Sequence, residues 1–556
     1  MHGVPRQRRL GFSATVAVIL GVVLLTLGYL AGHGGWIYKS RTWLASTVRR
    51  APKKAQRVAV RRSELVTAYH VLDIARVPLS RAFQLEEVGG HIVFATRYGQ
   101  LGALIGNRAI SLPVDIPIGL EALRADKVED NPAFDVTEIH VTDLLSIHTG
   151  GDQYVLYAAG LLYDKACFYI QIVRIGMRAD QDTVALTGKA WEPVFRTRDC
   201  RRLEGGVLVR GSQSGGRMVQ LDPHTILLSV GAIGNEERVA TLDPKSDFGT
   251  VITVPLDGRA PQTFARGFRN PQGLLVTRSG QIWETEHGPE GGDELNLLVS
   301  GRDYGWPFVT YGMQYGGRPT PWPFNPKVAS HEGYEAPKFA WIPSIGVSNL
   351  VQPNPEEFPH WANHLAIASL RAMTLHLVRI EGDRAVLVEP LPFHARIRDV
   401  INLADGRLAL ATDLGDVYLL GNADNQHTGR WRPDSVDVSA LAPLVPEAGL
   451  DASPLREAAT QFVEKCGGCH PVFGKAGAAP ALGGVIGRRV GSDTSYRYSR
   501  ALTGRTETWT VARLRQWINS PRSVFPGTAM PDPYIDFDVD GVIRYLQQQK
   551  PTTPAK

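Results

Sequence analysis

Hydrophobic and polar positions divide the chain into three parts. Residues 11–31 are almost entirely apolar or small and carry no charge, and a helix of that length, at about 1.5 Å per residue, crosses a ~30 Å hydrocarbon core. From residue 65 to residue 420, short apolar runs rich in β-branched residues are separated by turns. Near residue 456 the apolar positions change to helical spacing. The pattern predicts a multidomain protein with an N-terminal transmembrane helix, an all-β middle and an all-α C-terminal domain.

The middle part has the features of many short strands. Runs such as "DQYVLYAAGLLYD" and "CFYIQIVRIG" have strand length, and "DVINLADGRLALATDLGDVYLLG" alternates strands with turns, with Asp405-Gly406 as a hairpin turn. No long stretch here has a period of 3.6 residues. A single sandwich would not use so long a meander, whereas six four-stranded blades would take about 59 residues each. We therefore expect a six-bladed β-propeller over residues 65–420.

The remaining segments are expected to flank and connect these parts. Residues 1–10 would form a cytoplasmic N-terminus, and the basic residues 32–64 a juxtamembrane linker. Residues 421–455 are rich in Pro, Asp, Ala and Ser without periodicity, which is typical of a linker. The C-terminal domain would cover residues 456–550, just after Ser453-Pro454 as a helix start.

Charge alone leaves the placement of the chain ambiguous. Basic residues lie on both sides of residues 11–31, and there are more of them on the C-terminal side. Counting them would leave the bulk of the chain in the cytoplasm. A cleaved signal peptide is the alternative to a retained anchor, although the apolar part of such a peptide usually has about 7–15 residues. The net charge of +5 is too small for the chain's size to indicate nucleic-acid binding.

The sequence CGGCH places Cys466, Cys469 and His470 together. No further cysteine lies in the C-terminal half to complete a Cys₄ or Cys₃His zinc site, and the βαβ pattern around a thioredoxin-like dithiol is missing. A cysteine pair followed directly by histidine is the attachment pattern of c-type haem, with the histidine on the iron. Met530 is the only methionine in this domain, and its thioether suits the sixth position on low-spin iron. We expect one covalent haem c.

Residues 461–548 resemble the class I cytochromes c of mitochondrial type through "CGGCHPVFGKAGAAPALGGVIGRRVGS", "YRYSRAL" and "PGTAMP". The resemblance implies that the carbonyl of Pro480 accepts a hydrogen bond from the His470 ring. It also implies that Arg488, Tyr498 and Trp509 bind the haem propionates, the alternative being ordinary core and surface roles.

Haem is attached outside the cytoplasm in bacteria, so the chemistry resolves the orientation. The expected location is the inner membrane, with a single span, the N-terminus in the cytoplasm and the domains in the periplasm. In that compartment Cys167 and Cys200 could form a disulfide, and two buried free thiols are the alternative.

In the stretch 264–312, Arg269 lies beside Asn270, and a Gly- and Pro-rich turn follows that is crowded with Glu286, His287, Asp293 and Glu294. Composition alone favours a polar loop over a strand end. The order of residues, together with "WIPSIGVSNL" and "ARIRDVINLADGRLALATD", resembles the soluble quinoprotein glucose dehydrogenases and aldose sugar dehydrogenases. Those are six-bladed propellers that use pyrroloquinoline quinone (PQQ) and calcium.

The resemblance implies roles for individual residues. Arg269 and Asn270 would contact the quinone, and Gly288 and Pro289 would offer backbone carbonyls to calcium, with Asp293 nearby. The PQQ carboxylates would be bound by arginines, which are Arg371 (a lysine in that family), Arg396 and Arg398.

One position departs from the family. Its histidine general base falls here on Gln213, within "GSQSGGRMVQLD". Glutamine cannot take a proton at a useful rate, because a general base needs a titratable group near the working pH. His140, His148 or His224 could substitute, although structural roles are the simpler reading of each.

Two functions follow. The first is a membrane-anchored quinohaemoprotein that oxidises a sugar or alcohol and passes electrons through haem c to a respiratory acceptor, either a cytochrome or a terminal oxidase. The alternative is an electron carrier whose propeller is catalytically silent and serves binding or docking. The cradle residues favour the first function, and Gln213 favours the second.

Overall fold

The computed structural model describes most of the middle of the chain and parts of the C-terminal region. The described residues are 56–62, 68–76, 83–105, 108–126, 139–202, 211–233, 243–313, 327–328, 330–393, 395–413, 415–425, 462, 466, 470, 479–494, 496, 498–528, 530 and 539–549. None of their helices is long and apolar enough to cross a membrane. The predicted N-terminus 1–10, the anchor 11–31, most of the linker 421–455 and Cys469 lie outside the described residues.

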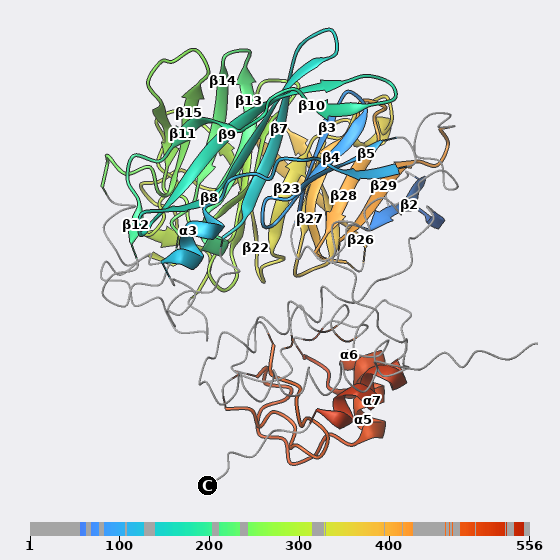
Figure 1. Ribbon diagram of the computed structural model, residues 1–556. Coiled ribbons are helices and arrows are strands. Elements are labelled where there is room, and N and C mark those ends of the chain that lie inside the picture. The colour runs from blue at the N-terminus through green and yellow to red at the C-terminus, as the bar shows by residue number, and fades with distance from the viewer. Residues whose placement is uncertain are drawn as a thin grey trace, which may run out of the picture.

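Twenty-seven of the strands form six antiparallel sheets, which we number as blades one to six (Figure 1). Blade one contains β3 (Phe83–Val88), β4 (His91–Thr96), β5 (Leu101–Ile105) and β6 (Arg108–Ser111). Blade two contains β7 (Val141–Gly150), β8 (Gln153–Asp164) and β9 (Cys167–Ala179), with β10 (Val184–Leu186), β11 (Glu192–Arg196) and β12 (Arg201–Arg202) all paired to β9. Blade three contains β13 (Gly215–Asp222), β14 (Thr225–Val230), β15 (Thr250–Pro255) and β16 (Gln262–Arg266), preceded by the 3₁₀ turn η3 (Gly211–Gln213).

The second half of the propeller continues in the same way. Blade four contains β17 (Pro271–Val276), β18 (Ile282–Glu286), β19 (Asp293–Leu298) and β22 (Phe339–Trp341). Blade five contains β23 (Val347–Val351), β24 (His364–Ser369), β25 (Thr374–Glu381) and β26 (Arg384–Pro392). Blade six contains β27 (Ile397–Asn402), β28 (Leu408–Thr412), β29 (Asp416–Asn422), β2 (Ala68–Arg76) and β1 (Gln56–Arg62). Outside the blades lie α3 (Leu120–Ala125), η4 (Pro359–Trp361) and a short parallel pair, β20 (Val309–Thr310) with β21 (Lys327–Val328).

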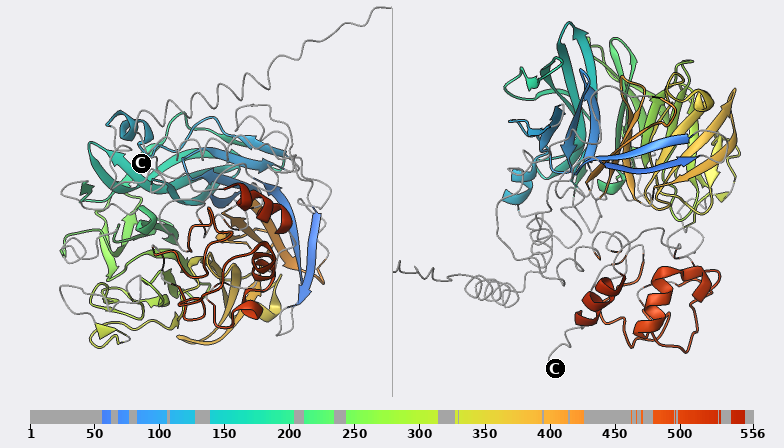
Figure 2. Two further views of the ribbon diagram at one scale, coloured as in Figure 1. Left: turned by 90° about the horizontal axis from the view of Figure 1, so that it is seen from below. Right: turned by 90° about the vertical axis from the view of Figure 1, so that its right-hand side faces the viewer.

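The first strands of the blades pack against one another in a closed ring. β3 contacts β7, and the contacts continue through β13, β17, β23 and β27, which returns to β3 (Figures 1 and 2). These strands are largely buried because each has a neighbour on both sides. The predicted six-bladed propeller is confirmed.

Blade six joins the two ends of the propeller. β2 pairs antiparallel with β29, so an N-terminal strand completes a sheet that the C-terminal strands begin. β1 then adds at the outer edge through β2. β1 lies within residues 32–64, so the expected linker is wrong for 56–62. Its sequence, QRVAVRR, carries the charges that often protect an edge strand, and those charges hide the strand pattern.

A disulfide links two strands of blade two. Cys167, at the start of β9, bonds to Cys200, just before β12, with Cα atoms 5.7 Å apart. β12 pairs with β9 at the same place, with Arg202 opposite Cys167. Of the two alternatives that the sequence left open, the structure has the disulfide.

The described C-terminal residues include helices, as predicted, and no strands. Three helices are present among them, α5 (Val511–Asn519), α6 (Pro521–Val524) and α7 (Val539–Gln548) (Figure 1). Thr510 caps α5 by accepting a hydrogen bond from the backbone N–H of Arg513. The buried faces of α5 and α7 share one apolar cluster, formed by Leu514, Trp517, Ile518, Val542, Ile543 and Leu546 together with Trp509 and Phe525.

Candidate active site and haem region

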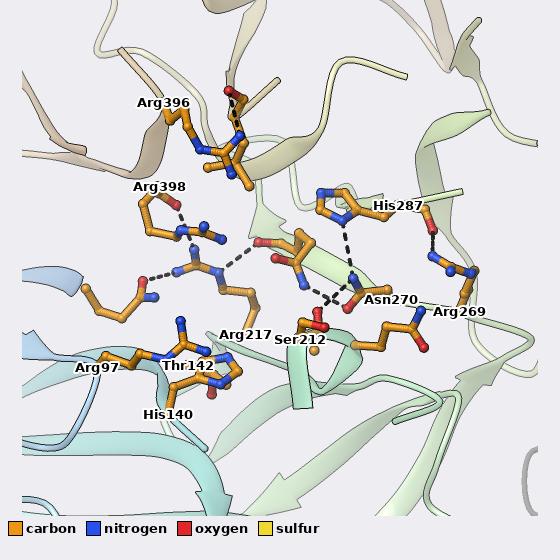
Figure 3. A pocket seen from close by; sticks show the side chains of 15 residues that line it. Arg97, His140, Thr142, Ser212, Arg217, Arg269, Asn270, His287, Arg396 and Arg398 are labelled. Atoms are coloured by element: carbon orange, nitrogen blue, oxygen red, sulfur yellow. Dashed lines mark hydrogen bonds between the residues drawn. The ribbon is translucent and has the colours of Figure 1, made fainter. Parts of the chain in front are cut away.

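A cavity of about 290 Å³ lies where the six blades converge (Figure 3). Every blade contributes to its lining, which consists of Gln84, Arg97, His140, Thr142, Ser212, Gln213, Gly215, Arg217, Arg269, Asn270, Gln272, His287, Leu370, Arg396 and Arg398. The lining is strongly polar, with Leu370 as its one large apolar side chain. Such convergence is typical of a ligand site.

Two arginines of blade six share one carboxylate. Arg396 Nε lies 2.7 Å from Asp413 Oδ2, and Arg398 Nε lies 2.8 Å from Asp413 Oδ1. Burial alone would raise the pKa of Asp413, but Arg398 and Arg396 outweigh it and hold that pKa below its ordinary value. One negative charge thus orients two positive groups at the cavity wall, which leaves a surplus of positive charge there.

The turn before β17 is held by a buried glutamate. Glu286 Oε2 accepts hydrogen bonds from the backbone N–H groups of Arg269, at 2.7 Å, and Asn270, at 3.2 Å. Burial raises the pKa of Glu286 to about 7, and the two N–H donors act against that rise. The Arg269 guanidinium donates to the carbonyls of His287 and Gly288 and lies 5.5 Å from the centre of the Trp306 ring. These contacts fix the side chain of Arg269, which lines the cavity.

His287 has both ring nitrogens engaged. Its Nε2 lies 2.5 Å from the carbonyl of Val347, so Nε2 carries the hydrogen, and Nδ1 accepts from the Asn270 amide at 3.3 Å (Figure 3). Asp293 secures the loop that offers this carbonyl, because its Oδ2 accepts from the N–H groups of Gly346 and Val347. Burial lowers the pKa of His287, so the ring is neutral at neutral pH.

Arg217, on β13, is the centre of a network that reaches every blade. Its side chain is 5% exposed. Its partners are Gln84 Oε1 at 2.8 Å, Asp143 Oδ1 at 2.9 Å, Asp399 Oδ1 at 3.1 Å and the carbonyl of Gln272 at 2.8 Å, and Asn349 joins through Asp399 at 2.8 Å. Burial raises the pKa of Asp143 to about 7, against the pull of Arg217. One guanidinium therefore ties together the inner strands of the whole ring.

The charges of the cavity lining are all positive. Five arginines line it, and no carboxylate does. Asp413, Asp143 and Asp399 lie behind the arginines and neutralise only part of their charge. The site is therefore suited to a ligand that carries several anionic groups.

Gln213 lies at the end of η3 and lines the cavity, where its Oε1 is buried without a hydrogen-bond partner in the described part of the chain. His140 also lines the cavity, whereas His148 and His224 are exposed and do not. Of the three histidines considered as substitutes for the missing base, the structure therefore brings only His140 to the site.

In the C-terminal region, His470 is oriented by a carbonyl, and several other candidate haem residues contact one apolar cluster. His470 Nδ1 lies 2.8 Å from the carbonyl of Pro480, so Nδ1 donates and Nε2 keeps a lone pair for a metal. Burial lowers the pKa of His470, which keeps the ring neutral. Cys466 and Met530 pack against the same apolar cluster as Tyr498 and Trp509. The chemistry of these residues suits haem c, and the axial roles of His470 and Met530 stay predictions.

Comparison with known proteins relates the two regions of the chain to two kinds of protein. Residues 178–420 match the family model "Glucose / Sorbosone dehydrogenase". The aldose sugar dehydrogenase YliI of Escherichia coli (strain K12) is 31% identical over 232 residues, which cover 38% of this chain and 60% of that protein. A crystal structure of a glucose dehydrogenase superposes with a TM-score of 0.52 at 26% identity, covering 64% of this chain and 99% of that one. Cytochrome c of Tetrahymena pyriformis is 37% identical over 105 residues, which cover 18% of this chain and 91% of that protein.

The C-terminal region belongs to the cytochrome c family, and the propeller is similar to the glucose/sorbosone dehydrogenase family model. The chain spans about 60% of the length of the curated aldose sugar dehydrogenase that it matches. The family match begins at residue 178, within β9, so blade one and most of blade two lie outside it.

Four of the five predicted PQQ residues line the cavity of the propeller. Arg269, Asn270, Arg396 and Arg398 line the cavity, but Arg371 is exposed, and its neighbour Leu370 lines the cavity instead. The carbonyl of Gly288 accepts a hydrogen bond from Arg269 at 3.0 Å, so a cation bound there would lie beside a guanidinium. Among the described residues no three acidic, histidine or cysteine side chains gather into a metal site. Calcium at Gly288 and Pro289 stays a prediction.

Two cavity arginines were not predicted. Arg97 comes from blade one, outside the match to the family model, and Arg217 comes from blade three, inside it. Arg217 had one signal in the sequence, since an arginine inside the apolar strand GGRMVQLD is costly unless it is paired. Arg97, in a turn between strands, had none.

Proposed function

We propose that this protein is a cytochrome-fused dehydrogenase, which oxidises a sugar or alcohol with PQQ in the propeller and passes the electrons to haem c. The observation that carries the proposal is the cavity: five arginines and no carboxylate line a site to which all six blades contribute. PQQ carries several carboxylates, which these guanidinium groups would bind in pairs.

The chain's own residues have separable tasks. Arg396 and Arg398, oriented by Asp413, would hold cofactor carboxylates, and Arg269 would lie beside the quinone. Bound PQQ would supply the two-electron oxidant for a C–H bond. The dense positive charge around the site would also stabilise negative charge that develops on the cofactor side.

The cytochrome region would be the electron acceptor of the propeller. A covalent haem on Cys466 and Cys469, with His470 and Met530 as axial ligands, takes up one electron at a time. Fusion keeps donor and acceptor in one chain, where a tether can raise the effective concentration to the order of millimolar. The apolar stretch 11–31 supports attachment to the inner membrane with both domains in the periplasm, where a respiratory cytochrome or oxidase would accept the electrons.

Reconstitution of the intact protein tests this function. The full chain is made with haem maturation and without PQQ, and PQQ is then titrated in the presence and absence of calcium. We expect stoichiometric PQQ uptake and, after addition of an aldose or alcohol, reduction of the haem seen at its α-band. A matched variant, R396Q/R398Q, should lose PQQ uptake and keep the haem spectrum. Absence of PQQ uptake by the unmodified protein would reject the dehydrogenase.

Gln213 favours a second candidate function. An amide at the position of the family's general base cannot accept the hydroxyl proton. If the protein binds no PQQ yet its haem exchanges electrons with external cytochromes, the chain is an electron carrier with a silent propeller.

A further inference from the structure

We propose that His140 is the proton acceptor of the propeller site, taking over the task that Gln213 cannot perform. This proposal rests on the dehydrogenase function proposed above. It concerns one imidazole from blade two, which lies outside the match to the dehydrogenase family model.

Few side chains in the cavity lining could accept a proton. Of the fifteen lining residues, five are arginines, which stay protonated, and no Asp, Glu, Lys, Cys or Tyr is among them. The only side chains there that can take up a proton near neutral pH are the imidazoles of His140 and His287.

His287 is unsuited to the task. Its Nε2–H donates to the carbonyl of Val347, and its Nδ1 lone pair accepts from Asn270. The Asn270 amide is itself held in place by the carbonyl of Ser212, at 3.1 Å, and by Gln272, at 2.9 Å. Protonation of His287 would break a bond in this network and bury a second cation beside Arg269. The network fits a structural role for His287.

His140 is placed to meet a substrate. It immediately precedes β7, and its backbone is fixed because its carbonyl accepts from the N–H of Leu161 at 3.0 Å. The residue is partly exposed, and it lines the cavity beside Thr142. Figure 3 shows its ring on the other side of the view from His287, below Arg97. A ligand within the cavity would therefore lie between a neutral structural imidazole and the accessible imidazole of His140.

Oxidation of an alcohol to a carbonyl releases one proton from the hydroxyl group, so one base is enough. A bound quinone would supply the two-electron oxidant that accepts the hydride from the alcohol carbon. The O–H proton passes to a ring nitrogen of His140, and the C–O single bond becomes a carbonyl. The imidazolium then releases the proton to solvent. The Oε1 of Gln213, which has no hydrogen-bond partner among the described residues, would accept a hydrogen bond from a second hydroxyl of the substrate, which suits a sugar or polyol.

Chemical labelling tests the placement without any activity. Diethyl pyrocarbonate acylates accessible neutral imidazoles, and peptide mass spectrometry identifies the sites. In the haem-loaded, PQQ-free protein we expect His140 to be labelled, exposed His224 to be labelled as an internal control, and His287 to be spared. Added PQQ should reduce labelling at His140 and leave His224 unchanged. Labelling of His287 in place of His140, or no effect of PQQ on His140, would overturn the placement.

Variants test the role. H140Q should bind PQQ as the wild type does, but kcat for haem reduction by substrate should fall roughly 10²–10⁴-fold. H140Q/Q213H, which restores an imidazole at the family's position, should recover a large part of the loss. H224Q, a surface control, should match the wild type.

Two failures remain distinguishable. If the wild type takes up PQQ and oxidises substrate but H140Q is equally active, the inference about His140 is wrong and the dehydrogenase stands. If the wild type takes up no PQQ, the proposed function itself fails, and this inference falls with it.

Discussion

At the scale of single residues, burial and backbone hydrogen-bond donors have opposite effects on the pKa of Glu286. The carboxylate holds the N–H groups of Arg269 and Asn270, yet it is 5% exposed as a whole residue, and its pKa rises to about 7. Between the unfolded pKa of 4.5 and the folded pKa of about 7, the folded protein keeps a proton that the unfolded chain has lost. The stability from this group is therefore full below pH 4.5 and is lost as the pH rises through 7.

The variant E286Q tests this sign. Glutamine keeps an acceptor oxygen for the two N–H groups but cannot ionise, so the fall in unfolding free energy between pH 5 and pH 8 should become smaller by about 3 kcal/mol at most. Urea unfolding at several pH values measures it, with exposed Glu356→Gln as the control. An unchanged pH slope in E286Q would show that Glu286 does not titrate in this range.

Met530 allows a second prediction at the residue scale. If its sulfur occupies the sixth position on the haem iron, M530A should open that position and increase the binding of carbon monoxide to the reduced protein. Optical titration with carbon monoxide measures this, and M313A, in the propeller, should behave as the wild type. Equal binding in M530A and wild type would mean that another group is the sixth ligand.

At the scale of elements, the inner strands depend on a buried ion network. Arg217 forms ion pairs with two buried aspartates, Asp143 and Asp399, and its removal would leave both without this counter-ion. Breaking a buried pair by removing one partner costs about 3–5 kcal/mol. The network is thus a feature of ring assembly as well as of the cavity wall.

Thermal unfolding of R217M should show a large loss of stability. The exposed pair Arg259–Asp257 offers the control, since R259M should have no measurable effect. If R217M is too unstable to purify, R217M/D143N/D399N removes the stranded charges and should recover stability relative to R217M. A stability of R217M equal to the wild type would show that the network contributes nothing.

The strands that could be predicted from the sequence share one property: residues close together in the chain form a recognisable pattern. Alternating apolar runs and turn residues such as Asp405-Gly406 exposed the strands, and chain length gave the blade number. β1 escaped because its arginines mask the pattern. In the site, Arg269, Asn270, Arg396 and Arg398 could be predicted because their segments resemble the family, and all four line one cavity. Its place in an apolar strand marks Arg217 as a paired residue, but only the contacts between blades bring Arg217 and Arg97 to the cavity.

At the scale of the whole molecule, closure of the ring makes an N-terminal strand essential. Deleting residues 1–76 would remove β1 and β2 and leave β29 as an open edge, and such edges promote aggregation. We expect this variant to be much less stable and less soluble than one lacking residues 1–55, which keeps both strands. Unfolding temperature and light scattering compare them. Equal stability of the two variants would mean that β2 is dispensable for closure.

The guanidinium of Arg217 has a consequence for how the proposed activity would be lost. Arg217 lines the cavity and is linked directly or through Asp399 to strands from across the ring, so detachment of a blade would disturb the cavity. Heat inactivation should then be all-or-none and coincide with the melting of the propeller. A bound cofactor should protect the sheets far from the cavity against proteolysis as strongly as the sheets next to it.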